Sequence, residues 1–159
     1  MKLVKLVYLL DRLSLARRGI PVVGGAYFSL PNGPITSELL DLINAGSLWG
    51  EIDCRWDELI SDRQNHEVAL KAAAPVEHLA PSELDLLGEI YREHGAKDQW
   101  ELRDWCHEHC SKWTSLGEGR DRIPLERIAR ALGRTDEQIK RLTQEAEELN
   151  YLTSAFART

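Results

Sequence analysis

The sequence predicts a mainly α fold (α+β): a compact helical domain of about six helices with a small two- or three-stranded antiparallel sheet. Three observations predict it. Apolar residues recur at helical spacing from Leu3 to Leu15, short extended stretches occur early in the chain, and capping patterns open helices in the second half. No linker or repeat is visible in the 159 residues, so one domain over residues 1–159 is expected.

The first helix is predicted to lie at the centre of the fold. Residues 6–10 are apolar on every side of a helix, which is typical of a buried element. Arg17 and Arg18 then suit the negative end of the helix dipole. Gly19 can adopt the left-handed conformation that ends a helix, so we expect the helix to stop there.

Extended chain is expected next. Val22, Val23 and the stretch Tyr27–Leu30 favour strand, and Gly24-Gly25 between them permits a tight turn with positive φ. The stretch Glu67–Ala72 alternates apolar and polar residues. We therefore expect Glu67–Ala72 to pair with Tyr27–Leu30 in a small antiparallel sheet.

A second helix should follow the turn at residues 31–34. Thr36 or Ser37 can cap it, and its apolar residues from Leu39 to Ile43 end before Gly46. Residues 47–65 carry weaker signals and are expected to hold one helical turn near Asp57.

Four helices are predicted in the second half. Ser82-x-x-Asp85, Asp98-x-x-Glu101 and Thr135-x-x-Gln138 each open one, and the first of these, residues 84–94, stops at Gly95. A shorter helix between the last two has Pro124 in its first turn and Gly133 at its end.

Composition narrows the class of function. A net charge of −6 favours a soluble protein and argues against broad affinity for nucleic acid or for an anionic membrane. No stretch approaches the roughly 20 apolar residues that a membrane span needs. Three cysteines cannot all pair within one chain, so a reducing cytoplasm is expected, and no cofactor is predicted.

Cys106-His-Glu-His-Cys110 is the sharpest local cluster of metal-ligand types. A structural zinc site needs four ligands, and one helix presents at most two or three of these side chains together. Free cysteine is also among the most buried residue types. Buried packing for both cysteines is therefore preferred to a metal site, and no metal is predicted.

The same segment, Arg103 to His109, is similar to the arginine and histidine motif of HEPN ribonucleases, which cut RNA without a metal. Six residues along a helix rotate by about 240°, so Arg103 and His109 would not share a face. No catalytic residue is assigned on this basis, and the enzyme remains the third alternative.

Residues 125–150 look like a helix-turn-helix, so the second alternative is a DNA-binding regulator. Asp136 and Glu137 fall at the start of the second helix, where base contacts are normally made. Their charges would repel phosphates, so two packed helices are the preferred interpretation and nucleic acid is not an expected partner.

The chain has five tryptophans. Tryptophan is enriched at the energetic centres of protein interfaces. Trp105 and Trp113 are expected in the core, whereas Trp49 and Trp56, in the weakly patterned region, are the candidates for a partner interface.

Blocks in fixed order resemble the SocA-like or Panacea antitoxin domain over roughly residues 3–132. The matching residues are Lys5, Leu6, Tyr8, Asp11 and Arg12, then Pro21, Gly24 and Tyr27, then Gly33, Pro34, Ser37, Glu38 and Leu39, and later Leu102, His107 and Trp113. The resemblance implies a non-enzymatic antitoxin whose partner is a cognate toxin, neutralised by occlusion or by delivery to a cellular protease.

The matched residues are expected to define the scaffold. Asp11 and Arg12 at the end of a buried helix need partners, because a buried charge without one is costly. Tyr8 and His107 are the hypothesised neighbours in one polar cluster.

Overall fold

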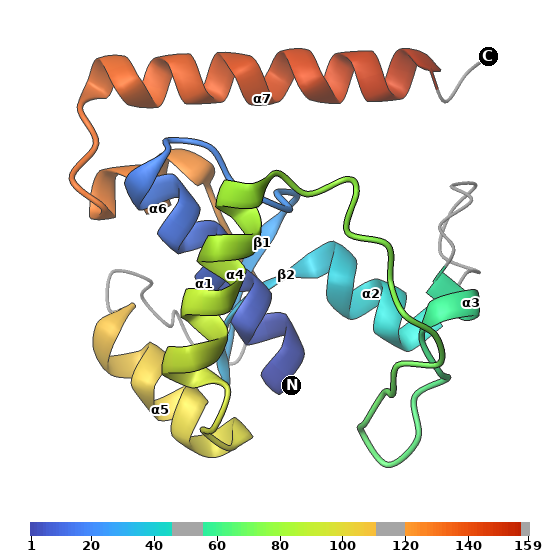
Figure 1. The fold of residues 1–159 in the computed structure, drawn as a ribbon. Helices are drawn as coiled ribbons and strands as arrows, with labels where there is room; N and C mark the ends of the chain where they lie inside the picture. The colour runs from blue at the N-terminus through green and yellow to red at the C-terminus, as the bar shows by residue number, and fades with distance from the viewer. Residues whose placement is uncertain (46–55, 111–119, 157–159) are drawn as a thin grey trace.

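The computed structural model describes residues 1–45, 56–110 and 120–156. Over these residues the chain forms seven helices and one three-stranded antiparallel sheet, so the predicted mainly α fold class is confirmed (Figure 1). Trp49 and Trp113, two of the predicted residues, lie outside the described residues.

Helix α1 (Lys2–Arg17) is the central element, as its apolar pattern predicts. It packs against α4, α5, α6 and β2, and Leu9, Leu10 and Leu15 belong to its buried face. Gly19 follows the end of the helix with a φ of +82°, which confirms its predicted role in ending it.

The sheet contains β1 (Tyr27–Leu30), β2 (Gly33–Thr36) and β3 (Asp121–Ile123) in the order β2-β1-β3. Tyr27 pairs with Thr36 of β2 on one side and with Ile123 of β3 on the other. The first strand and its antiparallel pairing are therefore as predicted.

The prediction that β1 pairs with Glu67–Ala72 is wrong. Glu67–Ala72 instead makes isolated bridges with the chain just before it, between Ile60 and Leu70 and between Gln64 and Glu67. The reason is burial: Ile123 of β3 is 5% exposed and enters the core, whereas Leu70 is 64% exposed. Alternation in the sequence shows that a stretch can form a strand but does not specify its partner.

The remaining helices are α2 (Ser37–Ala45), α3 (Trp56–Leu59), α4 (Pro81–His94), α5 (Gln99–His109), α6 (Leu125–Ala131) and α7 (Asp136–Phe156). Two predicted caps are present. The Asp98 carboxylate accepts hydrogen bonds from the backbone N–H groups of Trp100 and Glu101, and the Thr135 hydroxyl accepts one from Gln138.

Helix α4 begins three residues before the predicted start at Leu84. Pro81 occupies the first turn, where its missing N–H is not needed. Glu83 accepts a hydrogen bond from the Ala80 backbone N–H at 2.9 Å. This bond replaces the predicted Ser82-x-x-Asp85 cap.

One apolar core joins both halves of the chain. It includes residues of α1, α4 and α5 together with Ile128 and Ala129 of α6 and Ile139 and Leu142 of α7. Cys106 and Cys110 are buried within it as free thiols, as the packing interpretation predicts.

Candidate functional site

Asp11 is the centre of the first polar cluster. It lies on the buried face of α1, its side chain is 0% exposed, and it accepts four hydrogen bonds. Three come from backbone N–H groups, of Val22 at 2.9 Å, Val23 at 2.7 Å and Gly24 at 2.9 Å, and the fourth comes from the Tyr27 hydroxyl at 2.8 Å. The carboxylate thus holds the loop between α1 and β1 onto the helix.

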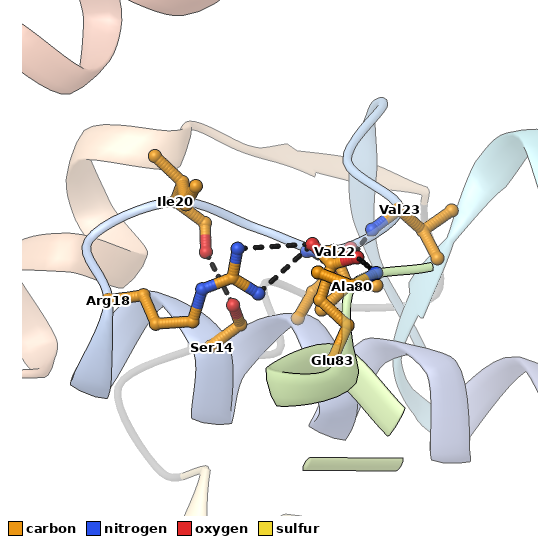
Figure 2. Close-up of polar contacts among 8 residues, drawn as sticks. Ser14, Arg18, Ile20, Val22, Val23, Ala80 and Glu83 are labelled. Atoms are coloured by element: carbon orange, nitrogen blue, oxygen red, sulfur yellow. Dashed lines mark hydrogen bonds and ion pairs between the residues drawn. The ribbon is translucent and has the colours of Figure 1, made fainter. Parts of the chain in front are cut away.

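The helix and the loop are also joined on either side of Asp11. The Ser14 hydroxyl donates to the Ile20 carbonyl at 2.7 Å, and Arg18 donates to Glu83 of α4 at 3.0 Å. Figure 2 shows both contacts below the loop that carries Val22 and Val23, with Ala80 beside Glu83. These contacts fix the loop between α1 and the start of α4.

A second carboxylate holds the other end of the loop. Both oxygens of Glu38, in the first turn of α2, accept the hydrogen bond of the Ala26 backbone N–H, at 2.8 and 2.9 Å. The Ser37 backbone N–H donates to the Ala26 carbonyl at 2.8 Å. Asp11 and Glu38 therefore bind successive parts of one glycine-containing loop, residues 20–26, which we call the clamped loop.

The electrostatics of this cluster favour stable hydrogen bonds to the loop over proton transfer. Burial raises the pKa of Asp11, and the hydrogen bonds from Val23, Tyr27, Gly24 and Val22 oppose that rise. Burial also raises the pKa of Tyr27, and the nearby Asp11 charge raises it further. The Tyr27 hydroxyl thus stays protonated and donates to Asp11.

The two glycines of the clamped loop should differ in their tolerance of alanine. Both have positive φ, +74° at Gly24 and +91° at Gly25, so each substitution carries about 1–2 kcal/mol of backbone strain. A Cβ at Gly25 would also stand 2.6 Å from Glu38 Oε2, whereas one at Gly24 would meet only Pro21 at 3.6 Å. We expect Gly25→Ala to destabilise the protein by about 1 kcal/mol more than Gly24→Ala, because it displaces a hydrogen-bonded carboxylate.

Chemical denaturation of the two alanine variants checks this difference. Adding Glu38→Ala to each isolates the clash, since the excess cost of Gly25→Ala should largely disappear once the carboxylate is gone. Equal losses for the two glycines in the parent background would contradict the expectation.

A second cluster surrounds Lys5, six residues before Asp11 on α1. Lys5 is 0% exposed, and its Nζ has no hydrogen-bond partner among the residues that the structure describes. The ammonium lies against the chain at Gly33, where a Cβ would stand 2.7 Å from Nζ and 3.6 Å from the ring of His107. Gly33 has a φ of +101°, so its missing side chain gives room to the lysine.

Two thiols complete the surroundings of Lys5. Burial lowers the pKa of Lys5, and the negative character of Cys106 and Cys110 opposes this. A hydrogen bond between the two thiols raises the pKa of Cys106 and lowers that of Cys110. In the described parts of the chain, no three or more His, Cys, Asp or Glu side chains are placed to hold a metal ion.

The hypothesis of one polar cluster is corrected by these positions. Tyr8 packs edge-on against Tyr27, with ring centres 6.0 Å apart, so it lies beside the Asp11 cluster. His107 belongs instead to the Lys5 cluster. Arg12 faces away from Asp11 and donates to the His109 carbonyl at 3.3 Å, because consecutive residues point to different sides of a helix.

The residues of the ribonuclease-like motif are each engaged locally. Arg103 lies over the Trp100 ring at 5.1 Å and pairs with Asp104 at 2.7 Å. His109 stacks on Trp105 with ring centres 4.4 Å apart. None of these three contacts joins Arg103 to His109.

The helix-turn-helix segment forms α6 and α7, and two of its arginines are bound within the protein. Arg134 donates to the carbonyls of Leu15 and Ala16 at the end of α1, and Arg130 pairs with Asp136 at 3.1 Å. The first contact supplies a donor to the Ala16 carbonyl and adds to the hydrogen bond that the Leu15 carbonyl already accepts from the Gly19 backbone N–H at 3.2 Å. These two arginines are thus engaged within the protein.

A family model described as antitoxin SocA-like, Panacea domain, matches residues 3–114. The chain belongs to the SocA-like Panacea antitoxin family. No curated protein and no solved structure matches it. Among the helices that the structure describes, none has the length and apolar content needed to cross a membrane.

The Panacea match contains every residue of the Asp11 and Lys5 clusters but leaves out β3, α6 and α7. The family residues Asp11, Gly24 and Tyr27 come together around the clamped loop. Gly33 and Pro34 lie in β2, where both are buried. Of the two tryptophans predicted at the interface, Trp56 opens α3 and is half-buried, and Trp49 lies outside the described residues.

Two residues of these clusters, Glu38 and Lys5, were not among the predicted site residues. Glu38 was counted only among the family residues. It binds the Ala26 N–H across the chain and not an N–H of its own helix, so a capping signal does not reveal its role. Lys5 carried a clearer signal: a single base lies one turn before Tyr8 within an apolar helix, on the face that Tyr8 predicts to be buried.

Proposed function

We propose that this Panacea protein is an antitoxin that neutralises a cognate toxin by binding it directly in the cytoplasm. Family membership carries the proposal, since the family is described as SocA-like antitoxins. No catalytic residue is assigned, and the protein is proposed to act without a cofactor as one domain.

The nature of the clusters supports a binding role. Asp11 and Lys5 are both fully buried, so their side chains present no polar group to a substrate. A scaffold fixed from inside leaves its exposed residues free to differ between partners. Exposed apolar side chains of the kind that binding surfaces use include Val23 at 60% and Trp100 at 50% exposure.

Coexpression tests the proposal. The product of the gene adjacent to this one should arrest growth when expressed alone, and this chain should restore growth while copurifying with that product as a stable complex. Asp104→Ala, a change of an exposed residue outside both clusters, should restore growth equally. A toxic neighbour whose arrest persists beside abundant soluble antitoxin would contradict direct neutralisation.

The amount of toxin distinguishes occlusion from delivery to a protease. Under occlusion, the toxin level stays constant during rescue and the purified complex is inactive. Under delivery, the toxin disappears during rescue, and a strain lacking the protease fails to recover.

A further inference from the structure

Helix α7 has two halves with different surroundings. Ile139 and Leu142, in its first two turns, are 5% and 6% exposed and belong to the core, and the helix packs on α6. Figure 1 shows α7, in orange to red, crossing one end of the molecule, with its C-terminal half running on past α6. The core therefore holds the N-terminal half of α7, and the C-terminal half extends beyond α6.

The C-terminal half of α7 carries a concentrated negative charge. Residues 144–156 contain three glutamates, Glu145, Glu147 and Glu148, and no lysine or arginine. This gives the half-helix a charge of −3 within a chain of net charge −6. All three glutamates are exposed, and Ala146 between them is half-buried. Such a surface attracts a basic partner and repels nucleic acid and anionic membranes.

A cleft with an apolar part and a charged part lies beside the C-terminal half of α7. A cleft of about 180 Å³ separates α7 from the end of α1. Its apolar lining comes from Leu15, Ile20 and Leu142, and the rest of its lining comes from Arg18, Gly19, Arg134, Gln138, Arg141 and Glu145. Ile20 is 41% exposed although it is large and apolar. It belongs to the clamped loop, whose backbone Asp11 and Glu38 hold, so the cleft has a rigid wall.

The bases at this cleft are already paired. Arg18 donates to Glu83, and Arg141 donates to Glu145 at 3.0 Å. Arg134 is engaged with the Leu15 and Ala16 carbonyls. Because Arg18 and Arg134 are engaged within the fold and Arg141 is paired with Glu145, the exposed Glu147 and Glu148 dominate the field that a partner meets.

We propose that the distal half of α7, from Glu145 onward, and the adjoining cleft at Ile20 form the docking surface for the toxin. The matching segment of the toxin would place an apolar side chain against Leu15, Ile20 and Leu142 of the cleft. Its lysine or arginine side chains would lie along Glu147 and Glu148, next to the Arg141–Glu145 pair. This inference rests on the proposed function. It also assigns specificity to a helix outside the family match, across the cleft from a loop that lies within the match.

Charge reversal tests the surface with a matched control. The variant E145K/E147K/E148K should weaken binding of the toxin, the product of the adjacent gene, by at least about tenfold, mainly through slower association. It should also lose most of the salt dependence of the affinity between about 50 and 300 mM NaCl. The control E67K/E77K/E108K changes the net charge equally at exposed positions elsewhere and should bind within about twofold of the parent.

A truncated chain ending at Gln144 provides the second variant. It keeps Ile139 and Leu142 in the core, so its thermal unfolding should stay cooperative while toxin binding is lost. Equal binding by the parent and both altered chains would overturn the docking surface and leave the proposed function standing. Failure of the parent to bind or rescue would overturn both. A parent that is dimeric without toxin and becomes monomeric on truncation would assign the surface to a second copy instead.

Discussion

Replacing Asp11 with alanine is expected to lower the free energy of unfolding by about 3–5 kcal/mol, a large part of the stability of a domain this size. The substitution removes the acceptor of four hydrogen bonds and leaves the N–H groups of Val22, Val23 and Gly24 and the Tyr27 hydroxyl without it. Each buried donor left unsatisfied costs about 1–3 kcal/mol, and movement of the loop toward water recovers part of the sum.

Guanidinium denaturation at 25 °C measures the loss. Asp11→Asn should fall between alanine and the parent, because the amide retains one oxygen acceptor and turns its NH₂ group toward backbone donors. Asp104→Ala removes an exposed carboxylate and should change stability by less than about 0.5 kcal/mol. An Asp11→Ala protein within about 1 kcal/mol of the parent would show that the clamped loop does not need its carboxylate.

Local sequence signals predicted the helices well. Asp98 and Thr135 cap their helices through their own side chains, and Gly19 takes positive φ, so residue identity alone was sufficient there. The start of α4 was missed because its cap comes from Glu83 inside the helix, reaching back to the backbone of an alanine. A cap made from within leaves no polar residue at the position where one is sought.

The pairing of the sheet depended on distant parts of the chain. Strand β3 has three residues, Asp121–Ile123, and lies far from β1 in the sequence. Its assignment depends on burying Ile123 against the same core that receives α6. Such an arrangement follows from tertiary packing, and no short pattern in the sequence encodes it.

The candidate site, like the fold, was predictable where local sequence determines it and not where distant parts of the chain meet. The need of Asp11 for partners was predictable from its place in a buried helix, but the partners are mostly backbone N–H groups, which every residue except proline offers. Polar side chains near Asp11 in the sequence or the motif, such as Arg12 and His107, are therefore misleading candidates for its partners. The glycines were the informative signal, because positive φ lets the loop turn its N–H groups toward one carboxylate.

The two buried charges of α1 contrast in their surroundings. Asp11 has four donors, whereas Lys5 Nζ has no acceptor among the residues that the structure describes. A buried carboxylate whose hydrogen bonds are all made stabilises a defined loop structure. A buried ammonium without an acceptor lowers the stability of the fold. Removing the charge of Asp11 is therefore expected to lower the free energy of unfolding, and removing the charge of Lys5 is expected to raise it.

Replacing Lys5 with methionine is expected to raise the free energy of unfolding by about 1–3 kcal/mol at neutral pH. Methionine keeps the unbranched stem that packs in the core and removes the polar group that has lost its hydration. The same change at Lys2 is the control. Lys2 donates to the Gly95 carbonyl at 2.6 Å, so Lys2→Met should be slightly destabilising.

The gain from Lys5→Met should also depend on pH in a defined direction. Because burial lowers the pKa of Lys5 below its usual 10.5, the folded protein releases this proton before the unfolded chain does. The parent therefore gains stability as the pH rises from the lowered pKa toward 10.5, and the advantage of the methionine variant shrinks over that window. Denaturation at a series of pH values from about 6 to 10 follows the difference between the two proteins. A variant less stable than the parent at neutral pH would mean that Lys5 contributes through a favourable charge interaction, with the neighbouring Cys110 as the first candidate.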